Sequence, residues 1–280
     1  IGYEALTLTT FPLVSHTGTA HARRSARTYL GVLVSTSVAF FLVAVVSTYM
    51  YTGTLDFTEG GVFREALAGD QIRPEYVATL FAMYIYGIGK AALMPMHRWL
   101  PAAMVAPTPV SALLHAVAVV KAGVFSVLKV TVYIFGINTM RECASAVIGG
   151  DWLIYMASFS ILAASGVAMY QDNLKRRLAY STVSQLSYIT LGAALLTQSS
   201  IQGGALHMVM HAFGKITLFF VAGAIYVTHH KTEISEMRGI GRKMPLTMTA
   251  FLLATLSIIG LPPMGGAWSK WLLIMGSLEA

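Results

Sequence analysis

Charged residues are scarce in this sequence, and cysteine is nearly absent. Asp, Glu, Lys and Arg make up only 11% of the 280 residues, whereas a soluble globular domain carries roughly 25%. The single cysteine, Cys143, excludes an intramolecular disulfide and any cysteine cluster for a metal. The sequence also lacks a glycine-rich dinucleotide loop and paired haem ligands. We therefore expect this chain to hold no cofactor of its own.

Long apolar runs dominate instead, and 56% of the residues are hydrophobic. A membrane-spanning helix needs about 20 mostly apolar residues. The runs predict an all-α, polytopic membrane bundle forming one domain, with no separate soluble part. The expected helices cover residues 1–14 (partial), 29–52, 75–93, 109–135, 152–171, 178–197, 204–227 and 245–277, the last broken near 261–266. Because the chain starts at Ile1 with the apolar pattern already running, we expect an internal piece of a longer protein.

Basic residues separate onto alternate sides of these helices. One side has eleven: Arg23, Arg24, Arg27, Arg98, Lys175, Arg176, Arg177, Lys231, Arg238, Arg242 and Lys243. The other has three: Arg64, Arg73 and Arg141. Cytoplasmic loops are the ones that carry Lys and Arg, so the first side is predicted to be cytoplasmic in a cell (inner) membrane. Long apolar runs separate the basic residues, so despite the net charge of +7 we expect no nucleic-acid partner.

Five lysines remain, all within apolar stretches: Lys90, Lys121, Lys129, Lys215 and Lys270. A desolvated lysine can release its proton, whereas an arginine cannot. A charge at mid-membrane costs at least ~2.5–3.5 kcal/mol, so such a residue faces a wet cavity or a partner. Lys129 lies toward the outer end of its helix, where snorkelling to the interface is an equal alternative. The other four are predicted to belong to one ion-conducting path.

Prolines gather at two places in the apolar sequence. The first group is Pro95, Pro101, Pro107 and Pro109, and the second is Pro262 and Pro263. Proline breaks helices, and freed carbonyls are tolerated at membrane depth only beside protein or water. Broken helices in two corresponding halves indicate a transporter built from inverted repeats. Lys90 precedes the first break, in the inner part of its helix, and Lys270 follows the second, in the outer part, so one lysine is expected toward each face.

Histidines accompany two of these lysines. His207, His211 and Lys215 are four residues apart, so they share one helical face and suit a water-joined proton relay. A two-histidine metal site is the rival interpretation, but the face offers no third ligand. His115 and Lys121 are six apart, roughly 120° off-face on a regular helix. Either the helix is distorted around Gly123, or the two residues contact different parts of the path.

Two sets of polar residues are predicted to support the path or the packing of the bundle. Ser111 lies one turn before His115 and is placed to orient it. Tyr180, Ser181, Thr182, Ser184 and Gln185 give the helix at 178–197 an unusually polar start. They suit either hydrogen bonding to water or holding helices together.

Several longer segments carry a family resemblance. They are Gly89–Ala92, Pro95–Pro101, Ala106–Ala116, Asp172–Gln185, His207–Lys215 and Gly260–Lys270. Together they resemble the antiporter-like proton-translocating subunits of respiratory complex I, of Mrp-type cation/proton antiporters (subunits A and D) and of membrane-bound hydrogenases. The resemblance runs nearly end to end and implies that the chain covers about the fifth to twelfth helices of a larger inverted-repeat core.

The resemblance also implies roles for particular residues. Glu4 would be the fifth-helix glutamate that pairs with the seventh-helix lysine, Lys90. His115 and Lys121 would be eighth-helix relay positions. His207, His211 and Lys215 would belong to the eleventh helix, and Lys270 would be the exit lysine of the twelfth. A carboxylate beside a desolvated lysine holds the proton on, so Glu4 would act as an electrostatic switch.

The expected function is proton translocation as a membrane subunit of a complex I-type NADH:quinone oxidoreductase. Subunits of an Mrp-type Na⁺/H⁺ antiporter or of a hydrogenase-linked pump are the alternatives. The expected partners are other membrane subunits, lipid and protons, with Na⁺ as a further candidate, and the energy would come from a partner or a counter-ion gradient. A membrane-embedded enzyme would need paired carboxylates or a nucleophile beside a base, which the apolar segments lack, so no catalytic residue is assigned. A structural scaffold would leave five intramembrane lysines unexplained.

Overall fold

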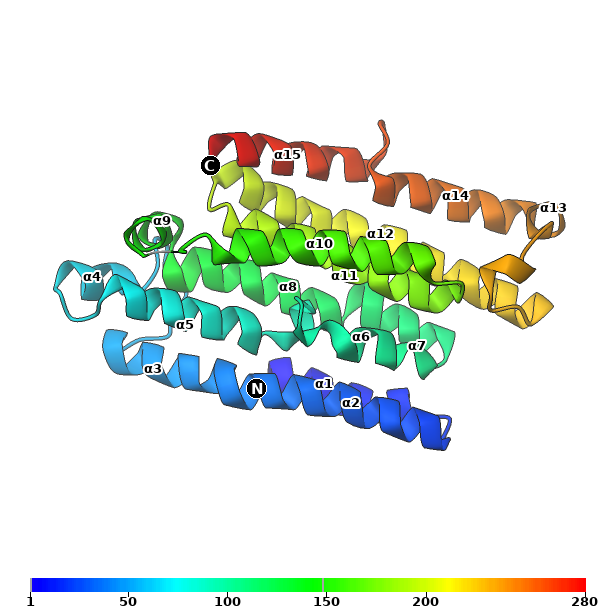
Figure 1. Ribbon diagram of the computed structural model, residues 1–280, viewed down its shortest axis with the longest axis horizontal. Helices are drawn as coiled ribbons and strands as arrows, with labels where there is room; N and C mark the ends of the chain where they lie inside the picture. Colours follow the sequence, from blue (N-terminus) through cyan, green and yellow to red (C-terminus); the bar gives the residue numbers. More distant parts are fainter. Residues whose placement is uncertain (1, 148) are drawn as a thin grey trace.

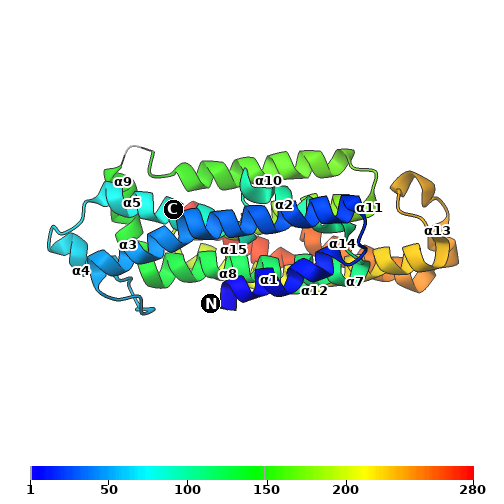
Figure 2. The same ribbon diagram turned by 90° about the horizontal axis from the view of Figure 1, so that it is seen from below.

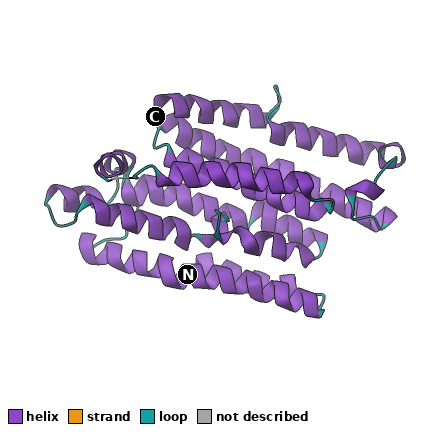
Figure 3. Cartoon of the chain, viewed as in Figure 1, coloured by secondary structure: helices purple, strands orange, loops and turns teal. Residues whose placement is uncertain are grey.

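The computed structural model describes residues 2–147 and 149–280, and in these ranges all regular elements are helices (Figure 3). The long helices run along the long axis of the molecule (Figure 1). Seen from below, α10 lies along one flank and α1 along the opposite flank (Figure 2). The predicted all-α helix bundle is confirmed.

The first helix lies where it is expected, and the second begins earlier than expected. They are α1 (Gly2–Ser15) and α2 (Ala20–Thr36), which continues through a π-helical segment, Ser37–Leu42, into α3 (Val43–Thr52). The hydroxyl of Thr19 accepts a hydrogen bond from the Ala22 amide at 3.1 Å, and this N-cap starts α2 nine residues before position 29. Arg23, Arg24 and Arg27 therefore lie in the first turns of a helix rather than in a loop.

The next lengthwise segment is broken, and its course differs from the expected helix at 75–93. After the short α4 (Phe63–Ala68), α5 (Pro74–Gly87) is followed by a 3₁₀ turn at Gly89–Ala91. Beyond Pro95 the chain becomes helical again, in a 3₁₀ turn (Met96–Arg98), α6 (Trp99–Ala102) and a 3₁₀ turn (Ala103–Val105). Arg98 thus lies in the second half of a broken segment, not between two segments.

Three of the prolines expected to break this region do not break it. Pro101 is the third residue of α6, where a backbone donor would have no intrahelical partner. Pro107 is the N-cap of α7 (Thr108–Ala112), and Pro109 is the second residue of that helix. Both positions suit the start of a helix, because proline is preorganised for the first turn. Of this group, only Pro95 lies at the break.

The remaining helices complete the bundle. α7 continues through a π-helical segment (Leu113–Val117), α8 (Val119–Lys129) and a second π-helical segment (Val130–Phe135). Then follow α9 (Ile137–Ala146), α10 (Trp152–Tyr170), α11 (Leu174–Ala194), α12 (Gln198–His229), α13 (Ile240–Lys243), α14 (Pro245–Ile259) and α15 (Gly265–Glu279). α11 begins at Leu174 because Asn173 caps it, its side chain accepting from the Arg176 amide at 3.1 Å. Lys175 therefore lies in a helix, not in a loop.

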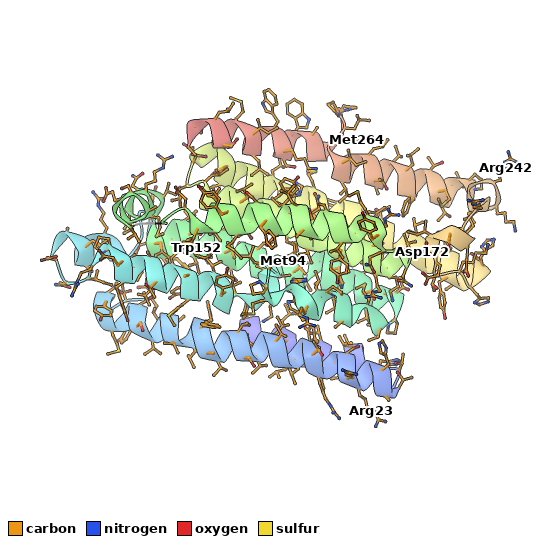
Figure 4. The ribbon with its side chains drawn as sticks, in the orientation of Figure 1. Arg23, Met94, Trp152, Asp172, Arg242 and Met264 are labelled. Carbon is orange, nitrogen blue, oxygen red and sulfur yellow. The ribbon has the colours of Figure 1, made fainter. Side chains whose placement is uncertain are left out.

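The second break separates α14 from α15. Gly260, with φ of 92°, ends α14 in the left-handed conformation, and Pro262 and Pro263 follow before α15 begins at Gly265. The α5–α6 and α14–α15 segments run in opposite directions along the bundle (Figure 1). In Figure 4, Met94 and Met264, one at each break, lie away from both ends of the molecule.

The exterior of the bundle is apolar. Tyr155, Leu162 and Met169 on α10 are each at least 69% exposed, as lipid-facing side chains are. Four helices are long and apolar enough to cross a membrane: Ala20–Thr52, Thr108–Phe135, Trp152–Tyr170 and Gln198–His229. The broken segments α5–α6 and α14–α15 consist of shorter helices. The chain is a multi-pass membrane protein.

Residues of the basic side lie at one end of the bundle. Arg23, Asp172 and Arg242 are near the same end, and Trp152 lies toward the other (Figure 4). At the first end, the Asp172 carboxylate accepts hydrogen bonds from the Ser235 hydroxyl at 2.6 Å and the Ser235 amide at 3.0 Å. These bonds hold the pKa of Asp172 below its usual 3.8 and tie the α10–α11 loop to the segment after α12.

We expect Asp172→Ala to weaken the attachment of the segment after α12 to the α10–α11 loop, because it removes both hydrogen bonds to Ser235. Limited proteolysis of the 231–243 segment at neutral pH should accelerate roughly threefold, because the local opening becomes easier. Since the folded-state pKa is lowered, the wild-type carboxylate contributes fully above 3.8 and loses its contribution only as the pH falls below that value. Asp172→Asn keeps one acceptor oxygen and should be intermediate. Equal cleavage rates for all three proteins would contradict the assignment.

Candidate functional site

The first break places Lys90 inside the protein. Its side chain is fully buried, and neighbouring groups satisfy the backbone freed by the break. The Trp99 indole donates to the Gly89 carbonyl at 3.0 Å, and the Met94 amide donates to the Ser160 hydroxyl at 3.3 Å. On α8, a Cβ at Gly123 would lie 2.3 Å from the carbonyl carbon of Lys90. Only glycine lets α8 pack this closely against the break.

Glu4 lies beside Lys90, as the family resemblance implied. The Lys90 Nζ is 3.3 Å from Glu4 Oε1, and this is the one ion pair among the residues that the structure describes. The Ser37 hydroxyl donates to the same carboxylate oxygen at 2.6 Å. The Lys90 ammonium also donates to the Tyr3 carbonyl and lies 3.2 Å from the centre of the Tyr3 ring. Tyr3 and Ser37 have no distinguishing signal in the sequence, because both contacts are made across helices.

Lys270 is held at the second break. Its Nζ donates to the carbonyls of Ile258 and Ile259 at 3.0 and 2.9 Å. These are last-turn carbonyls of α14, which have no intrahelical partner and carry the negative end of the helix dipole. Helix continues on both sides of each break, so the ammonium groups of Lys90 and Lys270 lie within the bundle. The expectation of one lysine toward each face stays a prediction.

Lys121 and His211 join two helices that are far apart in sequence. The Lys121 Nζ is 2.7 Å from His211 Nδ1, which links α8 to α12. A lysine ammonium only donates, so with a charged Lys121 the ring accepts at Nδ1 and carries its hydrogen on Nε2. That Nε2 is buried and has no hydrogen-bond partner among the described protein groups. The pair thus has one nitrogen available to a bridging water.

His207 lies one turn away on α12, between two polar side chains. Its Nε2 is 3.1 Å from Gln185 Oε1 on α11, and its Nδ1 is 2.9 Å from Ser269 Oγ on α15. The amide oxygen only accepts, so Nε2 carries a hydrogen. The Ser269 hydroxyl can donate to Nδ1, or accept from it while donating to the Gly266 carbonyl at 3.0 Å. Both protonation states of His207 are accommodated, and both nitrogens are occupied without a metal.

The next residues of the predicted path are Lys215, one turn beyond His211 on α12, and His115, in the π-helical segment that follows α7. Lys215 is fully buried and its Nζ donates to the Leu178 carbonyl at 3.1 Å. His115 is also fully buried, and its ring centre lies 5.3 Å from that of Phe219, one turn beyond Lys215. Neither nitrogen of His115 contacts a described protein acceptor or donor. Ser111 does not orient it, since its hydroxyl donates to the Ala106 carbonyl at 3.1 Å.

The helix distortion that relates His115 to Lys121 is not at Gly123. The π-helical turn at Leu113–Val117 contains His115, and Ala118 follows it with φ −100° and ψ −76°. A π-helical turn contains more residues than an α-helical turn, so it changes the angular relation between the two side chains. Gly123 lies within regular helix and provides close packing instead.

Lys129 is separate from these residues. Its Nζ lies 3.9 Å from the centre of the Phe57 ring, in the polar segment between α3 and α4. The alkyl chain of Lys129 thus lies along apolar surface, and its ammonium group reaches the polar segment at the end of the bundle, as in a snorkelling lysine. The snorkelling interpretation therefore fits Lys129 better than a place in the path.

Contacts from the polar start of α11 join it to α12 and α10, which supports its predicted role of holding helices together. Hydrogen bonding to water stays a prediction. Gln185 contacts His207, so it belongs to the candidate path. The Ser184 hydroxyl lies 2.9 Å from that of Ser165 and joins α11 to α10. Ser269 was missed altogether, because a serine beside Lys270 has no distinguishing sequence signal.

Comparison with known proteins finds relatives over the whole length of the chain. The sequence profile of the family described as NADH:quinone oxidoreductase/Mrp antiporter, transmembrane, matches residues 1–280. NADH-quinone oxidoreductase subunit N of Desulforudis audaxviator is 35% identical over 281 residues, covering 99% of this chain and 53% of that protein. NAD(P)H-quinone oxidoreductase chain 5 of Synechocystis is 32% identical over 240 residues, covering 82% of this chain and 34% of that protein.

Two solved structures share the fold. A chain of the Mrp complex from Dietzia superposes with a TM-score of 0.84 at 30% identity, covering 99% of this chain and 29% of that one. A chain of an archaeal membrane-bound sulfane sulfur reductase gives 0.83 at 29% identity, covering 98% and 54%. The chain thus spans about half of the length of its subunit N relative and about a third of the chain 5 relative. Within that span, the chain belongs to the NADH:quinone oxidoreductase/Mrp antiporter transmembrane family.

Proposed function

We propose that this chain is the proton-conducting core of an antiporter-like membrane subunit. The contact that carries the proposal is Lys121 to His211 at 2.7 Å, because it joins a half-buried lysine on α8 to the histidine–lysine face of α12. The proposed path consists of Glu4, Lys90, His115, Lys121, His207, His211, Lys215 and Lys270. These side chains lie within an apolar bundle, where a titratable group is costly unless it has a function.

Transfer along the path changes only N–H and O–H bonds. Glu4 stabilises the protonated form of Lys90, and weakening that pair releases the proton. Lys121 passes a proton to His211 Nδ1. His207, whose ring centre lies 6.3 Å from that of His211, can hold a proton on Nδ1 by donating to the Ser269 hydroxyl. Water bridging the unpartnered nitrogens of His211 and His115 would complete the connections, as buried polar groups without protein partners generally require.

Sodium/proton exchange is the second candidate, favoured by the likeness to a chain of the Mrp complex. A hard cation such as Na⁺ is bound by several oxygen ligands. Among the proposed path residues the one carboxylate is that of Glu4, which already accepts from Lys90 and Ser37. The nitrogen-rich chemistry of the path therefore supports H⁺ as the transported ion.

The driving energy is proposed to come from neighbouring subunits. The relatives are named as subunits of quinone oxidoreductases, and we propose that this chain holds no redox group and works in a similar multi-subunit complex. We also propose that the end with Arg23 and Arg242 faces the cytoplasm, following the distribution of basic residues.

Ion specificity of the assembled complex in proteoliposomes tests the proposed function. We expect proton translocation in sodium-free medium to stay within about twofold of that with Na⁺, because no step requires a metal cation. The measurement is vesicle acidification with a pH-sensitive dye, alongside uptake of radioactive sodium. Proton movement that requires Na⁺ and moves it in fixed proportion would favour the exchange alternative.

A further inference from the structure

A further lysine shares the chemistry of the path at the basic end of the bundle. Lys175 is the second residue of α11, and its side chain is half-buried. Its Nζ donates to the Ala106 carbonyl at 2.7 Å. That carbonyl lies in the connection between the first broken segment and α7. The contact therefore joins the first half of the chain to the second.

Lys175 lines a cavity of about 730 Å³. Thr108, Tyr226 and Lys231 contribute to the same wall. Thr17, from the loop between α1 and α2, and Lys231, after α12, place the cavity at the end that holds the basic clusters. Most of the lining is apolar, from residues such as Met104, Phe220 and Val227. The polar groups of Lys175, Thr108 and Lys231 give water its hydrogen-bond partners there, and the volume is large enough, since one water occupies roughly 30 Å³ of liquid.

The same helix links Lys175 to the buried groups. One turn further along α11, the Leu178 carbonyl accepts the hydrogen bond from Lys215. Lys175, Lys215 and Lys270 all donate to backbone carbonyls, whereas Lys90 faces a carboxylate. A neutral amine can still donate to a carbonyl, so these contacts persist whether or not the lysine carries its extra proton. This suits a group that must gain and lose a proton without moving.

We propose that Lys175 takes up protons from the water-accessible cavity at the basic end and passes them toward Lys215 and His115. The inference rests on the proposed function. A hydronium ion in the cavity transfers its proton to the neutral Lys175 amine, which leaves water and an ammonium. The ammonium then loses the proton to bridging water on the inner side, so the net change is one proton moved inward.

Lys175→Arg and Lys175→Met in the full-length, assembled complex test this proposal. Arginine keeps the charge and the hydrogen bond to Ala106 but does not release its proton. We expect both variants to lower the rate of proton translocation per assembled complex at least roughly fivefold. Arg176→Gln, which removes an exposed charge from the same turn, is the matched control and should leave the rate unchanged. A wild-type rate in Lys175→Arg would mean that Lys175 only clamps two segments or binds a lipid headgroup, and would overturn the proposal.

Chemical rescue separates proton uptake from other roles. Imidazole is small enough for the cavity, so adding it on the side of the basic end should restore part of the lost rate in Lys175→Met. It should not restore Lys215→Met, whose site is fully buried. Recovery from the opposite side only, or no recovery from either side, would overturn the assignment. If Lys215→Met and Lys90→Ala both pump normally, it is the proposed function that fails, which distinguishes the two failures.

Discussion

Replacing Lys215 with methionine is expected to lower proton translocation by the assembled complex at least roughly tenfold, since losing a proton-transfer group costs at least that much. Lys215 is fully buried and donates only to the Leu178 carbonyl. Methionine has a similar shape and suits an apolar site, so the substitution removes the titratable group while disturbing packing little. The initial rate of vesicle acidification, divided by the amount of assembled complex, measures the effect.

Lys129→Met is the matched control for this substitution. It also removes a lysine from an apolar helix, but the Lys129 ammonium lies over the Phe57 ring, apart from the path. We expect it to pump at close to the wild-type rate. Lys215→Arg should lower the rate of proton translocation as much as Lys215→Met, because arginine keeps the charge but does not release its proton. Normal pumping by both Lys215→Met and Lys90→Ala would exclude the proposed path.

Glu4→Gln is expected to have an effect of similar size, for a different reason. The substitution removes the countercharge 3.3 Å from the buried Lys90 ammonium while preserving shape and an oxygen that accepts from Ser37. Removing one partner of a buried pair leaves an uncompensated charge, so Lys90 should become neutral and stop holding a proton. We expect translocation to fall at least roughly tenfold, as for the loss of the lysine itself.

A double-mutant cycle checks that Glu4 acts through Lys90. Groups that work as one unit are non-additive, so Glu4→Gln combined with Lys90→Ala should be no slower than Lys90→Ala alone. Ser37→Ala, which removes a single hydrogen bond to the carboxylate, should slow pumping much less. If the two losses instead multiply, Glu4 and Lys90 act at separate steps, and the switch assignment is wrong.

The sequence predicts the bundle well because apolar run length and proline position are local signals. It locates the broken segments near Pro95 and Pro262. It does not locate the helix starts at Ala20 and Leu174, because these depend on side-chain caps from Thr19 and Asn173 within polar sequence. It also misplaces Arg98, because a hydropathy pattern cannot tell a loop from a second half-helix that continues in the same direction.

The candidate site is predictable only where its residues are unusual for their surroundings. A lysine in an apolar run is conspicuous, so Lys90, Lys121, Lys215 and Lys270 can be selected from sequence. Their partners are ordinary residues from distant elements, as Tyr3, Ser37 and Ser269 show. Lys175 cannot be selected from the sequence in the same way, because it stands in a cluster of basic residues, and such a cluster is typical of the surface.

The position of the two helix breaks has an electrical consequence. Both lie away from the ends of the bundle (Figure 4), so the steps from Lys90 to Lys270 do not cross the parts of the bundle between each break and the nearer surface. A unit charge crossing the whole membrane gains or loses ~2.3 kcal/mol for every 100 mV. Little of that work falls on transfers between the two breaks. A membrane potential should therefore act mainly on the steps by which protons reach the path from one surface and leave it at the other.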